Sequence, residues 1–175
     1  MRRFFTVLLS SLCVFALLFC VGCAPDEPPR DALAYQKDGA SVSVSGSIGE
    51  LQFAAIIRLS PCENAAERDF TIEYTAPAAL LGVSVSRRAD IYEARIDTVS
   101  VSGEAARRLA RPAEAFALGG EISKISAEDG ETLLTLACGE VAIVNGEPHR
   151  IKIVCGDGVP LAVNIEKYIK EGTKQ

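Results

Sequence analysis

The sequence contains no tryptophan, a single histidine and few aromatic residues, and these shortages exclude several kinds of site. Aromatic residues make up only 6% of the chain, although binding sites for sugars and peptides usually depend on aromatic platforms. The one histidine, His149, follows Pro148 at the start of a predicted strand, and no Gly-x-Ser-x-Gly motif accompanies it. We therefore predict no catalytic residue and expect a protein that is not an enzyme.

Metal and cofactor motifs are also missing. The cysteines after residue 23 stand at Cys62, Cys138 and Cys155, which is not a zinc-ligand spacing. The acids in Asp129-Gly130 and Asp157-Gly158 belong to turns and not to a calcium loop. No glycine-rich turn is followed by Lys-Ser or Lys-Thr, as a phosphate loop requires. We expect no metal and no cofactor.

The chain also lacks a basic run. Beyond residue 22 it has 16 basic and 23 acidic residues, a net charge of −7. Nucleic-acid binding depends on Lys and Arg that neutralise phosphates. We therefore exclude nucleic acid as a partner.

The first residues have the pattern of a bacterial secretion signal. Arg2 and Arg3 precede an uncharged apolar stretch of 18 residues, 4–21, which ends at Gly22-Cys23. The Val-Gly-Cys ending resembles a lipobox, which implies a diacylglyceryl group on the Cys23 sulfur and cleavage before it. An uncleaved membrane anchor is the alternative, because 18 residues are near the lower limit for spanning a bilayer.

This pattern divides the chain into four parts. Residues 1–22 are predicted to be the signal peptide, and 23–36 a lipidated tether rich in proline and charge. A single antiparallel β domain follows over 37–171, with a tail at 172–175. We expect an extracytoplasmic protein whose Cys23 lipid anchors it to the cell membrane, or to the outer membrane if the host has one.

Alternation of apolar and polar residues dominates the rest of the chain and predicts short strands. The expected strands are 41–47, 51–59, 70–76, 80–87, 91–96, 98–102, 120–126, 131–137, 140–144, 149–155 and 160–169. A two-residue turn with Gly49 first joins the first two strands and favours type II′. Residues 104–118 are rich in helix formers instead, and Pro112 is expected to break or kink that helix.

About ten strands with one helical insertion predict a mainly β fold. A curled antiparallel sheet, or half-barrel, accommodates the helix because the helix can cover the concave side. A β-sandwich is the alternative.

The order strand, proline-bearing turn and apolar strand recurs in a known family. Here it is formed by Leu51–Leu59, by residues 70–77 and by residues 80–83. In this outline the chain resembles the LolA-like half-barrel family of lipoprotein carriers. The resemblance implies a curled sheet that wraps around helices and encloses an apolar cavity for acyl chains.

Two functions remain open on this basis. In the first, the concave face binds or carries a lipid, the lipid of a lipoprotein or another apolar ligand. The candidate lining residues are large side chains at alternating positions: Phe53, Ile57, Phe70, Ile72, Tyr74 and Tyr92. The same residues also suit an ordinary packed core.

In the second function, the chain is a structural or interaction lipoprotein of the cell envelope with no small-molecule ligand. Residues 41–47, rich in serine, would then be an edge strand that pairs with a strand of a partner.

Cys138 and Cys155 are candidates for a disulfide, because exported proteins meet an oxidising environment. If residues 145–148 form a four-residue loop, Cys138 faces Cys155 directly. A register slipped by one residue matches Ile143 with Ile151 instead and gives a better apolar face. Sequence alone leaves both registers open.

Overall fold

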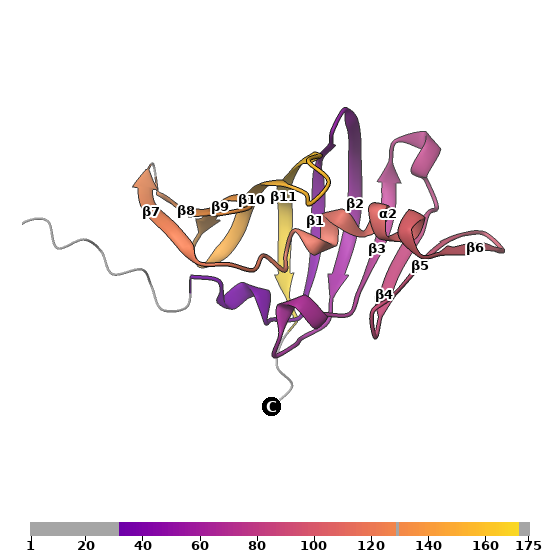
Figure 1. Cartoon of the computed structure of the whole chain (residues 1–175), viewed down its shortest axis with the longest axis horizontal. Helices are drawn as coiled ribbons and strands as arrows, with labels where there is room; N and C mark the ends of the chain where they lie inside the picture. Colours follow the sequence, from indigo (N-terminus) through magenta and orange to yellow (C-terminus); the bar gives the residue numbers. More distant parts are fainter. Residues whose placement is uncertain (1–31, 129, 172–175) are drawn as a thin grey trace, which may run out of the picture. The chain divides into compact units, whose positions relative to one another are not determined.

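A computed structural model describes residues 32–128 and 130–171, which form one antiparallel sheet with one α-helix (Figure 1). The elements are η1 (Ala34–Gln36), β1 (Ala40–Ile48), β2 (Leu51–Leu59), η2 (Ala65–Glu67), β3 (Phe70–Ala76), η3 (Ala78–Leu80), β4 (Ser84–Arg88), β5 (Ile91–Ile96), β6 (Val99–Ser102), α2 (Glu104–Glu114), β7 (Ile122–Glu128), β8 (Glu131–Leu136), β9 (Gly139–Val144), β10 (Glu147–Val154) and β11 (Pro160–Lys170). The predicted mainly β fold is confirmed, and the sheet has eleven strands, as many as the ranges expected from the sequence.

The sheet is curled but not closed, because its two edge strands, β6 and β7, do not pair. Strands β1 to β6 follow one another toward one edge, and β11 back to β7 lead to the other edge. The two series meet in the middle, where β1 pairs with β11. The predicted half-barrel is therefore confirmed, and the single sheet removes the sandwich alternative.

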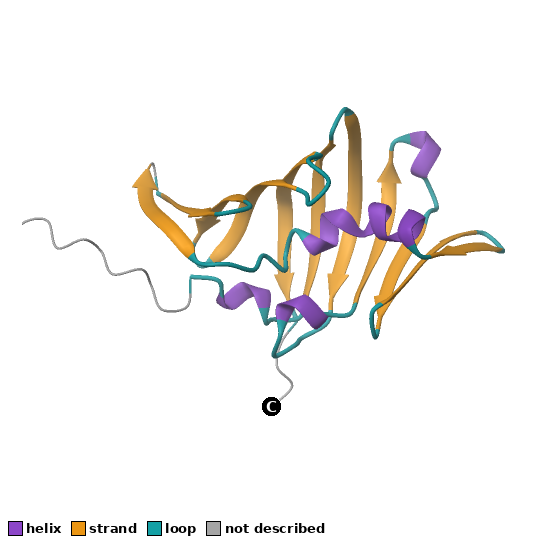
Figure 2. Ribbon diagram, in the orientation of Figure 1, coloured by secondary structure: helices purple, strands orange, loops and turns teal. Residues whose placement is uncertain are grey.

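Residues 103–121 connect the two edges, and α2 lies within this connection. The helix packs on β3, β4, β5 and β6 and also contacts β11 (Figure 2). We call the face of the sheet that carries α2 the inward face. The helix continues through Pro112 and ends at Glu114, so of the break or kink predicted at the proline the break is absent, and the helical residues stop before the predicted 118.

Burial alternates along the strands and assigns the apolar residues to the inward face. Directly paired residues point to the same side of a sheet, so the strand register shows which residues continue this face on the next strand. The connected pairs include Val44–Ala55, Ile57–Ile72, Ile72–Val85, Val44–Ile165, Val163–Ile151, Ile151–Val141 and Val141–Leu134. One continuous apolar face therefore runs through the sheet.

The turn between β1 and β2 has the predicted geometry. Ile48 pairs with Leu51, and Gly49 has a φ of 59° while Glu50 keeps an ordinary negative φ. A positive φ at the first turn position alone is the type II′ pattern.

The register of β9 with β10 differs from both predicted registers. Val144 pairs with Glu147 across a two-residue turn, and an irregularity at His149 then shifts the pairing so that Ile151 faces Val141. The sequence analysis missed this because a bulge changes register without a composition signal. Val154, rather than Cys155, donates its backbone N–H to the Cys138 carbonyl at 2.9 Å.

Two further expectations are wrong. Residues 41–47 lie in β1, which is paired on both sides in the middle of the sheet and is not an edge strand. The strand expected over 80–87 begins only at Ser84, because residues 78–80 form the 3-10 turn η3 and the Leu80 N–H bonds to the Pro77 carbonyl.

The signal peptide, the lipidated Cys23, the tether up to residue 31 and the tail at 172–175 lie outside the described residues. Within residues 32–128 and 130–171, no helix combines the length and the apolar character needed to cross a membrane.

Candidate ligand-binding interior

All six candidate lining residues lie on the inward face. Phe53, Ile57, Phe70, Ile72 and Tyr74 are buried on β2 and β3, and Tyr92 is half-buried on β5. The aromatic rings meet edge to face, with centroids 6.2 Å apart for Phe53–Tyr74 and 6.3 Å apart for Phe70–Tyr92. The structure therefore brings the predicted residues together on one surface.

The helix α2 occupies much of that surface. The Tyr74 hydroxyl donates a hydrogen bond to the Leu109 carbonyl at 2.6 Å, and the Tyr92 hydroxyl donates to Glu114 Oε1 at 2.7 Å. Burial raises the pKa of both hydroxyls, so both remain protonated donors. Small buried residues at Ala106 and Ala110 let the helix approach closely. The candidate tyrosines thus hold the helix in place.

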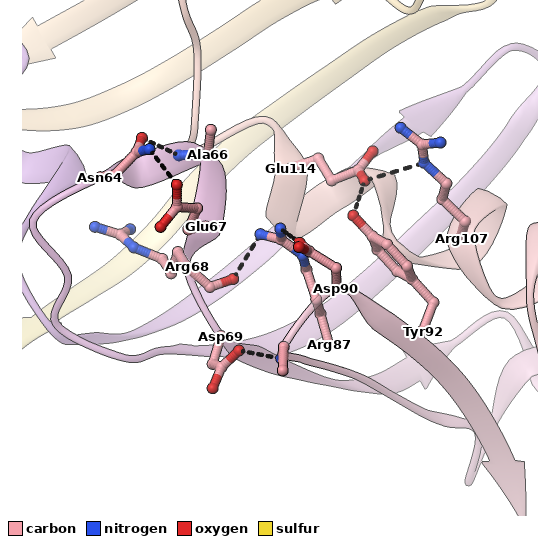
Figure 3. A network of polar contacts seen from close by, with 11 residues as sticks. Asn64, Ala66, Glu67, Arg68, Asp69, Arg87, Asp90, Tyr92, Arg107 and Glu114 are labelled. Atoms are coloured by element: carbon pink, nitrogen blue, oxygen red, sulfur yellow. Dashed lines mark hydrogen bonds and ion pairs between the residues drawn. The ribbon is translucent and has the colours of Figure 1, made fainter.

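A network of polar side chains lies between η2 and α2 (Figure 3). The buried Arg87 donates to the Arg68 carbonyl at 3.0 Å and forms an ion pair with Asp90. The Tyr92 ring lies between two guanidinium groups, 5.7 Å from Arg87 and 5.8 Å from Arg107. These cation–π contacts and the Glu114 bond fix the ring beside a pocket of about 400 Å³.

The other half of the inward face is aliphatic. Its buried residues on β8 to β11 are Leu134, Leu136, Val141, Ile143, Ile151, Leu161, Val163 and Ile165. None of them was among the predicted lining residues, because the sequence analysis selected mainly aromatic side chains. The apolar residues at the alternating positions 161, 163 and 165 could have identified this part of the face from the sequence.

A second set of residues that the sequence analysis missed is polar. Tyr35, Gln36 and Arg68 are buried although they lie in η1 and in the connection before β3. Tyr168 on β11 also reaches the inward face, because β11 has an irregularity between Ile165 and Lys167 that sets Tyr168 opposite the buried Val42. Polar connecting segments ordinarily lie at the surface, so no sequence signal marks Arg68.

Two other hollows are charged. One, of about 480 Å³, lies on the outer side of β2 to β5, where Arg58 pairs with Glu73 at 2.6 Å and Arg95 with Glu93 at 3.1 Å. The other, of about 500 Å³, is lined by arginines of α2 and by Cys138 and Cys155, among other residues. Both hollows carry charged side chains, so neither is a purely apolar cavity.

Cys62, Cys138 and Cys155 are free thiols in this structure. Burial raises the pKa of the Cys155 thiol, which favours its protonated form. Within residues 32–128 and 130–171, no group of three or more His, Cys, Asp or Glu side chains is arranged to hold a metal ion. The exposed His149 lies 3.8 Å from Glu131 at the surface.

No protein-family model matches the sequence, and no curated protein is significantly similar to it. Solved structures are similar in fold. An uncharacterized conserved protein from Thermus thermophilus has a TM-score of 0.50 and 12% identity, covering 81% of this chain and 85% of that one. A LolA superfamily protein from Nitrosomonas europaea gives 0.43 and 10%, covering 78% and 87%. A putative outer membrane lipoprotein-sorting protein domain from Vibrio parahaemolyticus gives 0.43 and 6%, covering 79% and 87%.

Proposed function

We propose that this chain is a non-enzymatic lipoprotein of the cell envelope that binds or carries an apolar ligand on its inward face. The observation that carries the proposal is the continuous apolar inward face of an unclosed sheet, half of which is mainly aliphatic. Apolar surface that converges around a concave site is the usual setting for ligands with acyl chains. The LolA-like resemblance of the sequence implies the same type of ligand.

The six predicted lining residues belong to the proposed site as part of its wall. Because Tyr74 and Tyr92 hold α2 through hydrogen bonds, the helix and these side chains form one wall. The ligand's chain then lies against the aliphatic residues of β8 to β11, and of these strands α2 packs on β11. Because these aliphatic residues are buried by the protein itself, binding requires the segments that cover them to move aside.

Membrane attachment is the second part of the proposal. The basic start, the apolar stretch 4–21 and the Val-Gly-Cys ending support lipidation of Cys23. Two acyl chains on that residue would give a stable tether, whereas one chain binds reversibly.

A partner-binding function is supported by a different surface. Edge strand β6 is exposed along its length, and Val99 and Val101 are 59% and 50% exposed. An exposed edge with apolar side chains can accept a strand from another protein. This candidate moves the predicted pairing edge from residues 41–47 to β6.

Expression of the full chain in a bacterial host tests both parts of the first proposal. We expect the wild-type protein in the membrane fraction, with an N-terminal peptide that starts at a diacylated Cys23, and expect Cys23→Ser to leave that fraction. Native mass spectrometry of the extracted protein should show a bound lipid. An unmodified Cys23 would contradict the anchor, and a protein that never carries lipid would contradict the ligand.

A further inference from the structure

Five described residues place polar atoms in the protein interior without hydrogen-bond partners; one of them, Arg87, pairs with Asp90 through another nitrogen, and the other four concern us here. Tyr35 Oη, Gln36 Nε2, Arg68 Nη1, Arg68 Nη2 and Tyr168 Oη are buried, and none has a hydrogen-bond partner among the described residues. We call these four residues the donor cluster, because guanidinium and amide nitrogens are donors only and a phenol can donate. Buried polar groups are nearly always bonded, so a group of five such atoms in one place indicates a missing acceptor.

Contacts through Cys62 bring the members of the donor cluster together. Arg68 Nε donates to Cys62 Sγ at 3.3 Å, and the Cys62 thiol contacts the Gln36 carbonyl at 3.6 Å. The Gln36 side chain is close enough to the Tyr35 hydroxyl to oppose the rise in its pKa, although no hydrogen bond of standard geometry joins the two groups. Arg68 is also close enough to both phenols for its charge to act on them. The cluster thus joins η1, the connection before β3, and β11.

The protonation states make the donor cluster positive. Arginine stays charged at all relevant pH values. Burial raises the pKa of both Tyr35 and Tyr168 to about 12, so their hydroxyls keep their protons. The carboxylates whose charges act on Tyr168 are Asp38 and Glu147, and Asp38 is paired with Lys170 at 2.7 Å.

Arg68 itself is an unpaired buried charge. Its side chain is 2% exposed, and it forms no ion pair with a described residue. A buried charge that has no partner of opposite charge destabilises the folded protein. A native arginine buried without such a partner therefore indicates that an anion binds beside it. A carboxylate or phosphate offers several acceptor oxygens and can take two bonds from one guanidinium.

We propose that the donor cluster binds the anionic head group, carboxylate or phosphate, of an amphiphile whose chain lies on the aliphatic inward face. This inference rests on the proposed function and adds the chemistry of the ligand. Tyr168 lies on the same face of β11 as Ile165 and Val163, and it pairs with the buried Val42 of β1. Tyr168 therefore places the proposed head-group site beside the inward face that would hold the chain.

The test compares ligands that share a chain and differ in the head. The full chain, delipidated and held in the uncharged steroid detergent digitonin, is titrated calorimetrically with laurate, dodecyl phosphate and dodecanol, and separately with inorganic phosphate. Arg68→Met removes the charge at similar volume, and Tyr168→Phe removes only a hydroxyl. Arg58→Met is the matched control, because Arg58 pairs with Glu73 on the outer face.

We expect laurate or dodecyl phosphate to bind the wild type more tightly than dodecanol does. Arg68→Met should weaken the binding of the preferred anion about tenfold, since a charge-assisted bond is lost. The affinity for dodecanol should stay unchanged. Tyr168→Phe should weaken the binding of the anion about threefold, which keeps the test valid if Arg68→Met fails to fold. Arg58→Met should change the affinity for neither ligand.

Equal binding of anions and dodecanol to the wild type and to both cluster variants would overturn the head-group site and leave the proposed function intact. Inorganic phosphate that binds in an Arg68-dependent way, without binding of any chain-bearing ligand, would assign the cluster to a free anion and overturn the amphiphile. If no chain-bearing ligand and no phosphate binds, the proposed function fails as well.

Discussion

At the scale of single residues, the tyrosines of the interior divide into two groups. Tyr74 and Tyr92 donate to acceptors on α2, whereas Tyr35 and Tyr168 have no partner among the described residues. The first pair accounts for how the helix is fixed on the sheet. The second pair, together with Arg68, accounts for where a polar ligand group would be held.

Tyr74→Phe tests the structural role of the first pair. Loss of the 2.6 Å bond to the Leu109 carbonyl should lower the free energy of unfolding by about 1 kcal/mol. Urea unfolding followed by circular dichroism measures this change. An unchanged free energy would mean that the hydroxyl does not hold α2.

Tyr35 should make the protein sensitive to alkali. Its pKa rises from an ordinary value of 10.0 to about 12 in the folded state, mainly through burial. The folded state therefore holds the proton more tightly, and this contribution to stability is complete below pH 10 and is lost as the pH rises toward 12. In that window the unfolding free energy should fall by about 1.4 kcal/mol per pH unit for this group.

Unfolding measured at several pH values in the wild type and in Tyr35→Phe isolates this effect. The variant should show a shallower decline, because it lacks the titrating hydroxyl. Parallel pH profiles for the two proteins would contradict the assignment.

At the scale of elements, the pairing of β1 with β11 is the seam that joins the two halves of the sheet. Gly46 sits on this seam, and a Cβ atom there would lie 2.0 Å from the Ala162 carbonyl oxygen and 3.2 Å from the Phe53 ring. Because the closest atom belongs to the backbone, the strand itself would have to move. The seam therefore depends on one position without a side chain.

Gly46→Ala should destabilise the fold by about 2 kcal/mol or more, since overpacking against a backbone cannot be relieved by a side-chain rotation. Gly119→Ala is the control, because Gly119 is exposed and a Cβ there meets nothing within 4 Å. Thermal unfolding of the two variants should separate them clearly. Equal melting temperatures would show that the seam tolerates movement.

The exposed edge β6 gives a second prediction for an element. Val101→Lys should leave the free energy of unfolding within about 0.5 kcal/mol of the wild type, because the side chain is half exposed. The charge should also reduce pairing of this edge with other strands. Analytical ultracentrifugation would show less self-association or partner binding, and an unchanged profile would argue against β6 as a docking edge.

At the scale of the whole molecule, the periodicity of the sequence predicted the strands of the sheet and their buried sides, but it did not predict the polar groups of the interior. Alternating residues such as Val42, Val44 and Ile57 predicted both the strands and their buried sides, because one face of a sheet must be apolar. Bulges were not predictable, since one extra residue at Glu166 redirects Tyr168 without altering composition. Arg68 was missed because a buried arginine in a connecting segment has no local pattern.

The topology explains why a ligand site belongs in this fold. The chain must cross from edge strand β6 to edge strand β7, and α2 on that crossing covers one part of the inward face (Figure 2). The aliphatic residues of β8 to β10 lie on the remaining part of the same face. The donor cluster adds polar groups to this surface, which suits a ligand with a charged head and an apolar chain.

The most direct test of the amphiphile site is a nuclear Overhauser measurement on the protein with laurate labelled with ¹³C. We expect contacts from the chain's methylene groups to methyl groups of Leu134, Val141 and Val163, and from the methylene next to the carboxylate to Tyr168. Contacts confined to the exposed valines of β6, or no contacts with the inward face, would contradict the site.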